Sequence, residues 1–135
     1  FVGLVPVDHA LSGNKTLSLS DFTGLPYIAY APILGVSYQN VVIQHARDVG
    51  VSLDIVEEVG HTFGIVALVA AGMGVGVAPS WVTHTPHVGV AYIPMPELPA
   101  DAVNLALAWP EDTMSRVIDE FVQCARAFVR DLNGL

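Results

Sequence analysis

The sequence has 135 residues, enough for one ordinary hydrophobic core and too few for two independent domains. Hydrophobic residues make up 53% and charged residues 13%, which excludes a disordered tail, and no apolar run reaches the roughly 18 residues of a membrane span. Five Lys and Arg against 13 Asp and Glu give a net charge of −8, and the cations are scattered, so this chain alone is not expected to bind nucleic acid.

In the first 60 residues, short apolar runs alternate with helical patterns. The predicted elements are a strand at 1–7, a turn at 11–14, a short helical start at 18–22, a strand at 26–30, a loop at 31–37, a helix at 38–49 and a strand at 51–59. The helix has an apolar face that includes Val42 and Val49, and Gly50 ends it. His45 lies on the same face, where a half-buried, hydrogen-bonded histidine is expected rather than a metal ligand.

Residues 61–81 are the most apolar stretch and are expected to lie at the centre of the fold. Apolar side chains recur at helical spacing from Phe63 onward and leave little polar face, so the helix should be covered on most sides. Thr62 is placed as the N-cap, and Gly72 is placed as the left-handed residue that ends the helix. A short buried strand at 75–78 follows.

The remainder contains an irregular connection at 82–90, an extended segment at 91–96, a last strand at 103–109 and a long amphipathic helix at 112–132. Cys124 falls inside this helical pattern and is predicted to be a small core residue. Strands that alternate with helices predict an α/β domain in which helices flank a mixed or parallel sheet.

The sequence offers little support for an enzyme, a metal or a cofactor. The glycines of 72–76 follow a helix and precede a strand, which is the wrong order for a dinucleotide loop. His84 and His87 are separated by Pro86 and lack a third ligand nearby, so a surface turn is expected there. No Gly-x-Ser-x-Gly elbow accompanies Asp8-His9, and we predict that the chain is not an enzyme.

A binding cleft is the remaining candidate. The loop at 31–37 and the helix that starts at Thr62 each follow a strand, and such segments border the ligand crevice of open α/β sheets. The free amides of that helix suit an anionic group, Pro32 to Leu34 would form an apolar wall, and Tyr30 and Ser37 could supply hydroxyls. The alternative is that Thr62 is only a cap.

Four segments in order resemble one family, the LysR-type transcriptional regulators. They are Asp8-His9-Ala10-Leu11-Ser12, where Ala10 stands for the family's usual proline; Leu17 to Phe22 with Pro26-Tyr27-Ile28; Val69-Ala70-Ala71-Gly72-Met73-Gly74-Val75; and Leu105 to Trp109 followed by a helix that contains Phe121. The chain is similar to the C-terminal part of the family's effector-binding domain.

The resemblance implies one lobe of a type 2 periplasmic-binding-protein-like fold. Residues 1–12 would be the first crossing strand and turn, residues 13–103 the second lobe, and residues 104–135 the second crossing strand plus a C-terminal helix of the truncated first lobe. The rest of that lobe and the DNA-binding helix-turn-helix would lie upstream. The resemblance therefore implies a cytoplasmic regulator that binds a small-molecule effector with an anionic or carboxylate group. It implies no membrane partner and no cofactor.

The resemblance also assigns residues. It implies that half of the effector site comes from Ala31, Pro32, Ile33, Leu34, His61 and Thr62. It implies a homodimer or homotetramer whose interface uses Tyr38, Val42, His45, Val49 and Ile55. The alternative function is the lobe of an exported solute-binding protein that serves a small-molecule transporter, since the two classes share this architecture.

Overall fold

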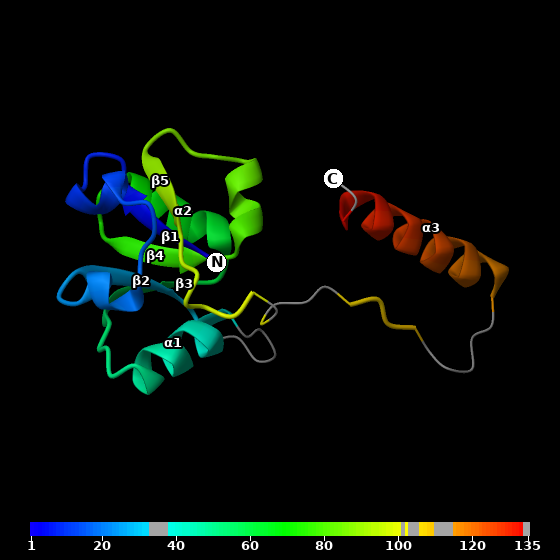
Figure 1. Ribbon diagram of the computed structural model, residues 1–135, viewed down its shortest axis with the longest axis horizontal. Coiled ribbons are helices and arrows are strands. Elements are labelled where there is room, and N and C mark those ends of the chain that lie inside the picture. The colour runs from blue at the N-terminus through cyan, green and yellow to red at the C-terminus, as the bar shows by residue number, and fades with distance from the viewer. Residues whose placement is uncertain (33–37, 101, 103–105, 110–114, 134–135) are drawn as a thin grey trace. The chain divides into compact units, whose positions relative to one another are not determined.

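The computed structural model describes residues 1–32, 38–100, 102, 106–109 and 115–133 (Figure 1). It divides into two compact units, residues 1–103 and residues 104–135, which are treated separately below. The first unit contains strands β1 (Val2–Pro6), β2 (Pro26–Tyr30), β3 (Asp54–Val59), β4 (Val75–Ala78) and β5 (Val90–Pro94), helices α1 (Tyr38–Asp48) and α2 (Thr62–Ala70), and the short 3-10 helices η1 (Ala10–Gly13), η2 (Leu19–Phe22) and η3 (Ser80–His84). The second contains helix α3 (Arg116–Asn133).

The first unit is built on one five-stranded mixed sheet with the strand order β3-β2-β4-β1-β5. Strand β2 pairs in parallel with β3 and with β4, whereas β1 runs antiparallel to both of its neighbours, β4 and β5. The prediction of a mixed sheet flanked by helices is therefore confirmed.

Alternating side chains of the strands form a core on each face of the sheet. Tyr27 and Ala29 of β2 pack in one cluster with Val42 and Ala46 of α1. Ile28 and Tyr30 point to the other face and pack in a cluster with Ile65, Val66 and Val69 of α2. The two helices therefore cover opposite faces of the sheet, as Figure 1 indicates.

Helix α2 is covered on one side only, which corrects the expectation that it would be enclosed. Its buried residues are Thr62, Ile65, Val66 and Val69, all directed at the sheet. Phe63, the first residue of the predicted apolar pattern, is 52% exposed. The pattern could not identify the buried side because nearly every residue of the helix is apolar.

Gly50 and Gly72 end helices as predicted, and a third glycine, Gly76, has a packing role. Gly72 and Gly50 adopt positive φ angles of 75° and 72°, which end the turns after α2 and α1. At Gly76 in β4, an added Cβ would lie 2.5 Å from the Cγ2 atom of Ile65. This glycine therefore allows α2 to pack directly on the sheet.

Residues 104–135 form a separate unit in which α3 carries a strongly amphipathic pattern. Residues 106–109 belong to no helix or strand, and residues 103–105 of the predicted last strand lie outside the described residues. Cys124 is exposed, so its placement as a core residue was wrong for this structure. The exposed large apolar side chains of α3 include Val117, Phe121, Phe128 and Val129.

Candidate functional site

The candidate site lies at the edge of the sheet where the parallel strands end. Because β2, β3 and β4 run in the same direction, their carboxyl ends meet at this edge, and Ala31 and Pro32 after β2, the start of α2 and η3 follow them there (Figure 1). Ligands of open α/β sheets bind outside the carboxyl ends of the strands. We refer to this end as the carboxyl edge of the sheet.

Backbone pairing sets the positions of the two predicted loops at the carboxyl edge. Tyr30, the last residue of β2, is in register with Val59, the last residue of β3. The pairing continues one residue further, because the Ala31 amide donates to the Val59 carbonyl at 2.8 Å. The segment that leaves β2 therefore begins beside the segment that leads into α2.

Helix α2 is capped by His61 rather than by Thr62, which corrects the predicted N-cap. His61 is extended, with φ −156° and ψ 156°, and its Nδ1 atom accepts a hydrogen bond from the Gly64 amide at 3.0 Å. The absence of a side chain at Gly64 brings this first turn close to β3, since an added Cβ would lie 3.2 Å from the Cβ atom of Val59. The cap therefore uses one of the amide donors that the start of the helix leaves unpaired.

The hydroxyl of Thr62 has a different partner. Thr62 Oγ1 lies 2.8 Å from the hydroxyl of Tyr30, and both residues are buried. A hydrogen bond between two buried hydroxyls fixes both side chains, because leaving either unpaired would be costly. The pair joins the end of β2 to the first turn of α2 and so makes the site rigid.

The structure places four of the six predicted effector residues. Ala31 is half-buried, Pro32 and His61 are exposed, and Thr62 is buried. Ile33 and Leu34 lie outside the described residues, as does Ser37. The described members all lie at the carboxyl edge.

Two aromatic residues at this edge were not predicted as site residues. Phe63 is the second residue of α2, and Trp81 follows the end of β4 by three positions in the chain. Their ring centroids lie 6.0 Å apart with an interplanar angle of 70°, which is an edge-to-face contact. The position of Trp81 soon after a buried strand was the signal that could have drawn attention to it.

The groups at the carboxyl edge are hydrogen-bonding groups and apolar surface. The edge offers backbone amides at a helix start, the imidazole of His61, the buried hydroxyl pair and apolar surface at Pro32. A helix start favours an anionic group through its unpaired donors and its dipole. Within the described ranges, no group of three or more His, Cys, Asp and Glu residues could hold a metal ion.

The residues predicted for a subunit interface do not share one surface. Val42 is 2% exposed and packs in the core, so it cannot contact a second copy of the chain. Val49 and Ile55 are exposed, and the side chain of Tyr38 lies outside the described residues. Val49 directly follows the end of α1, and Ile55 lies on the edge strand β3.

His45 is partly buried but not hydrogen-bonded as predicted. Its Nε2 atom is buried without a hydrogen-bond partner, and the nearest acidic oxygen is Oε2 of Glu97 at 3.9 Å. The other carboxylate oxygen of Glu97 accepts a hydrogen bond from the Leu19 amide. His45 therefore belongs to the packing of α1 against η2 and the segment after β5, rather than to an open surface.

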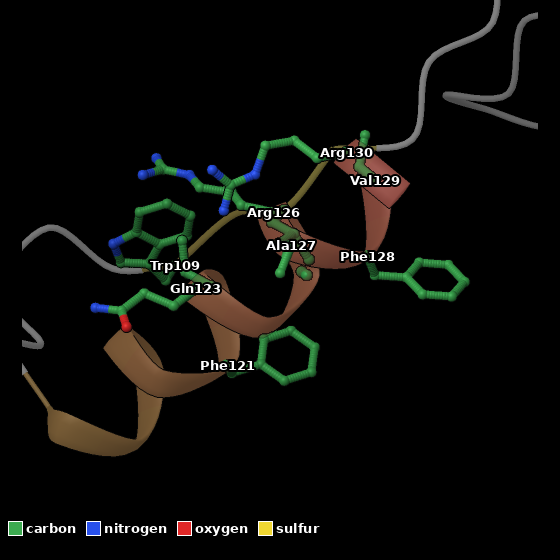
Figure 2. A pocket seen from close by; sticks show the side chains of 11 residues that line it. Trp109, Phe121, Gln123, Arg126, Ala127, Phe128, Val129 and Arg130 are labelled. Carbon is green, nitrogen blue, oxygen red and sulfur yellow. The ribbon is translucent and has the colours of Figure 1, made fainter. Parts of the chain in front are cut away.

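A hollow within residues 104–135 lies along α3. It is lined by Leu107, Trp109, Phe121, Val122, Gln123, Ala125, Arg126, Ala127, Phe128, Val129 and Arg130. Figure 2 shows Trp109, Phe121 and Phe128 among the side chains around it. None of these residues was predicted to bind an effector.

No helix in the described part of the chain is both long and apolar enough to cross a membrane.

Comparison with known proteins gives a consistent result. Residues 1–130 match the family described as the LysR substrate binding domain. The chain is 27% identical over 111 residues to the uncharacterized HTH-type transcriptional regulator YnfL of Escherichia coli strain K12; the match covers 82% of this chain and 37% of YnfL. The chain therefore spans little more than a third of that relative.

Solved structures agree on the fold. The regulatory domain of Synechocystis PCC6803 CcmR, in complex with 2-PG, superimposes with a TM-score of 0.76 at 18% identity, over 94% of this chain and 61% of that one. The BenM effector binding domain with its effector benzoate gives a TM-score of 0.65 at 23% identity, over 75% of this chain and 46% of that one. At these identities the likeness concerns the fold alone.

Proposed function

This chain belongs to the LysR substrate binding domain family, and from that premise we propose that it is the C-terminal part of the effector-binding domain of a cytoplasmic transcriptional regulator. In this proposal the chain binds a small anionic effector at the carboxyl edge of the sheet. DNA is bound by a helix-turn-helix elsewhere in the intact protein. The wider family is one of transcriptional regulators, which agrees with a binding role rather than an enzymatic one.

The observation that carries the proposal is the hydrogen bond between Tyr30 and Thr62. It joins the two segments predicted to line the effector site, at the end where open α/β sheets bind ligands. Because the hydroxyl of Thr62 is already held by Tyr30, we assign Thr62 a positioning role. Direct contact with the effector then falls to His61, to the amides of the first turn and to Pro32.

An anionic effector is supported by the first turn of α2. The first turn of α2 contains no acidic residue that would repel an anion, and its amides carry partial positive charge. BenM was solved with benzoate, a carboxylate, in a domain of the same fold. We therefore propose a carboxylate-bearing effector.

We further propose that intact subunits associate through the surface formed by the end of α1 and by β3. Strand β3 is an outermost strand of the sheet and pairs on one side only, so the backbone groups on its other side are available to a second chain. Ile55 and Val56 of this strand are 41% and 50% exposed, and Val49 lies after α1. A homodimer or homotetramer would cover these apolar side chains.

The solute-binding alternative has less support. It would share the two-lobed architecture, but the family match and the relative YnfL both belong to transcriptional regulators. A solute-binding protein delivers its ligand to a transporter, whereas a regulator converts ligand binding into a change of DNA binding.

Calorimetric titration of the intact regulator tests the site. The probe is benzoate, the variants are Pro32→Asp and Thr62→Val, and the control is Val88→Asp. Val88 is 95% exposed and precedes β5, which starts at the opposite edge of the sheet. We expect Pro32→Asp to weaken binding at least about tenfold, because it adds a negative charge beside an anion, and Thr62→Val to weaken it less.

Unchanged affinity in both variants, or an equal loss in Val88→Asp, would contradict the site.

A gel-shift experiment on residues 1–135 tests the proposal that DNA is bound elsewhere in the intact protein. We expect no measurable DNA affinity at physiological salt, because a chain of net charge −8 displaces few counterions from phosphate. Specific binding by this chain alone would contradict it.

A further inference from the structure

Phe63 and Trp81 form an exposed aromatic pair at the carboxyl edge. Phe63 is 52% exposed and Trp81 is 42% exposed, although the two rings contact each other edge to face. An edge-to-face contact uses the edge of one ring and one face of the other, so ring surface remains accessible on both residues. We refer to these two residues as the aromatic pair.

The packing of the sheet does not require this pair. The residue next to each ring in the sequence is buried instead. Thr62, before Phe63, is hydrogen-bonded to Tyr30, and Val82, after Trp81, packs in the core. In η3 the inward position is therefore filled by Val82, and Trp81 is directed away from the core. Large exposed aromatic groups in contact with each other are typical of binding surfaces rather than of scaffold.

The position of the pair relates it to the anionic site. Phe63 immediately follows Thr62 and lies in the turn whose amides face the carboxyl edge. Trp81 reaches the same edge from β4, which runs parallel to β2. A ligand whose charge sits at the first turn of α2 would thus have its apolar part beside two aromatic rings.

We propose that the aromatic pair binds a planar ring of the effector, so that the effector is an aromatic carboxylate rather than an aliphatic one. This proposal rests on the proposed function, because it takes the carboxylate to lie at the first turn of α2. The ligand ring stacks on, or meets edge-on, the surface that Phe63 and Trp81 leave open. Such contacts favour aromatic over saturated rings of the same size, because the ring quadrupoles add to the burial of area.

The test compares two probes that differ only in the ring, benzoate and cyclohexanecarboxylate, in titrations of the intact regulator. The variants are Phe63→Leu and Trp81→Leu, which keep an apolar side chain but remove the aromatic ring. The matched control is Phe128→Leu, a phenylalanine of α3 in the other unit of the chain. Pro32→Asp is included as the variant that disables the anionic site.

We expect the wild type to bind benzoate about two- to tenfold more tightly than cyclohexanecarboxylate, the range that an aromatic contact supplies. Each variant of the pair should lose this preference while its affinity for cyclohexanecarboxylate changes less than about twofold, and Phe128→Leu should keep it. Benzoate should also quench or shift the indole fluorescence that Trp81→Leu removes.

The outcomes separate the two proposals. If Pro32→Asp weakens both probes but the pair variants leave the preference intact, the aromatic site is wrong and the effector site stands. If neither probe binds the wild type, or Pro32→Asp weakens neither, both proposals are overturned. If Trp81 is already shielded from acrylamide in the ligand-free intact protein, the pair is a contact with another part of that protein, and the aromatic site is again wrong.

Discussion

Helices α2 and α3 both carry large apolar side chains, and they differ in what covers them. Helix α2 is apolar on nearly every side, and its inward residues pack against β1, β2 and β4. Helix α3 has a well-separated apolar face, yet Phe121 and Phe128 on it are more than 60% exposed. Helix α2 therefore has a buried side without a distinct apolar face, whereas α3 has a distinct apolar face that is exposed.

The difference teaches that a pattern predicts the need for a partner and not the partner's identity. The partners of α2 are strands β1, β2 and β4, which the same chain supplies. Helix α3 and residues 106–109 enclose only an open hollow of their own (Figure 2). We expect α3 to contribute its stabilisation in the intact protein, where a first lobe would cover its apolar face.

The largest effect on stability is expected when a buried side chain of α2 is truncated to alanine and compared with an exposed one of α3. Ile65→Ala in α2 should lower the free energy of unfolding of the chain by about 2–5 kcal/mol, because Ile65 is fully buried between the helix and Gly76. The matched change Phe121→Ala in α3 should cost less than about 1 kcal/mol, since its ring is exposed. Urea denaturation followed by circular dichroism measures both. Equal losses would show that α3 is packed in solution.

A smaller effect is expected at the hydrogen bond that anchors α2. Thr62→Val and Tyr30→Phe each remove one side of the bond between the two buried hydroxyls. Each change should cost about 1–3 kcal/mol. The double variant should cost less than the sum, by a coupling energy of about 0.5–3 kcal/mol for groups in contact. Strict additivity in a thermal or urea double-mutant cycle would show that the bond is not formed.

Alkaline pH should perturb residues 1–103 through Tyr27. Burial, and next the neighbouring Tyr30, raise the pKa of the Tyr27 phenol above its ordinary value. The folded chain therefore keeps this proton at a pH where the unfolded chain loses it. Stability is fully present below the unfolded pKa of about 10 and declines as the pH rises above it. Tyr27→Phe should reduce this decline in urea titrations at increasing pH, and an unchanged slope would contradict the burial of the phenol.

The smallest effect is expected on the surface of α3. Arg116 and Glu120 lie one helical turn apart, and both side chains are largely exposed. They form an ion pair in which Nε of Arg116 lies 2.7 Å from Oε1 of Glu120. Arg116→Ala should change the free energy of unfolding by no more than about 0.5 kcal/mol, and less at high salt. A loss above 1 kcal/mol would mean that this end of α3 has a role beyond the pair.

Much of this architecture could be predicted because it depends on local signals. The alternation of strands and helices, the glycine at 72 and the helix that begins at Tyr38 all follow from spacing or from backbone chemistry. The cap was placed one residue late because Thr is a common N-cap, whereas here a buried tyrosine 32 positions away holds its hydroxyl. Val42 was assigned to an interface because the resemblance implicated its whole helix, and an apolar helix face does not reveal whether it meets the sheet or another subunit.

The site could be predicted in outline only. Strand ends predicted the edge and the loop that contains Pro32, and the resemblance added His61. The contact of Phe63 with Trp81 joins residues 18 positions apart through two separate elements, and no local pattern contains it. Contacts of this kind depend on how α2 and η3 pack, which sequence spacing does not determine.

Hydrogen–deuterium exchange on the intact regulator, with and without benzoate, tests the central claim most directly. The account predicts slower exchange at the amides of residues 61–64 when benzoate is bound, and unchanged exchange at residues 88–90 on the opposite edge of the sheet. Protection that spares residues 61–64 and falls instead on the opposite edge or on α3 would contradict it.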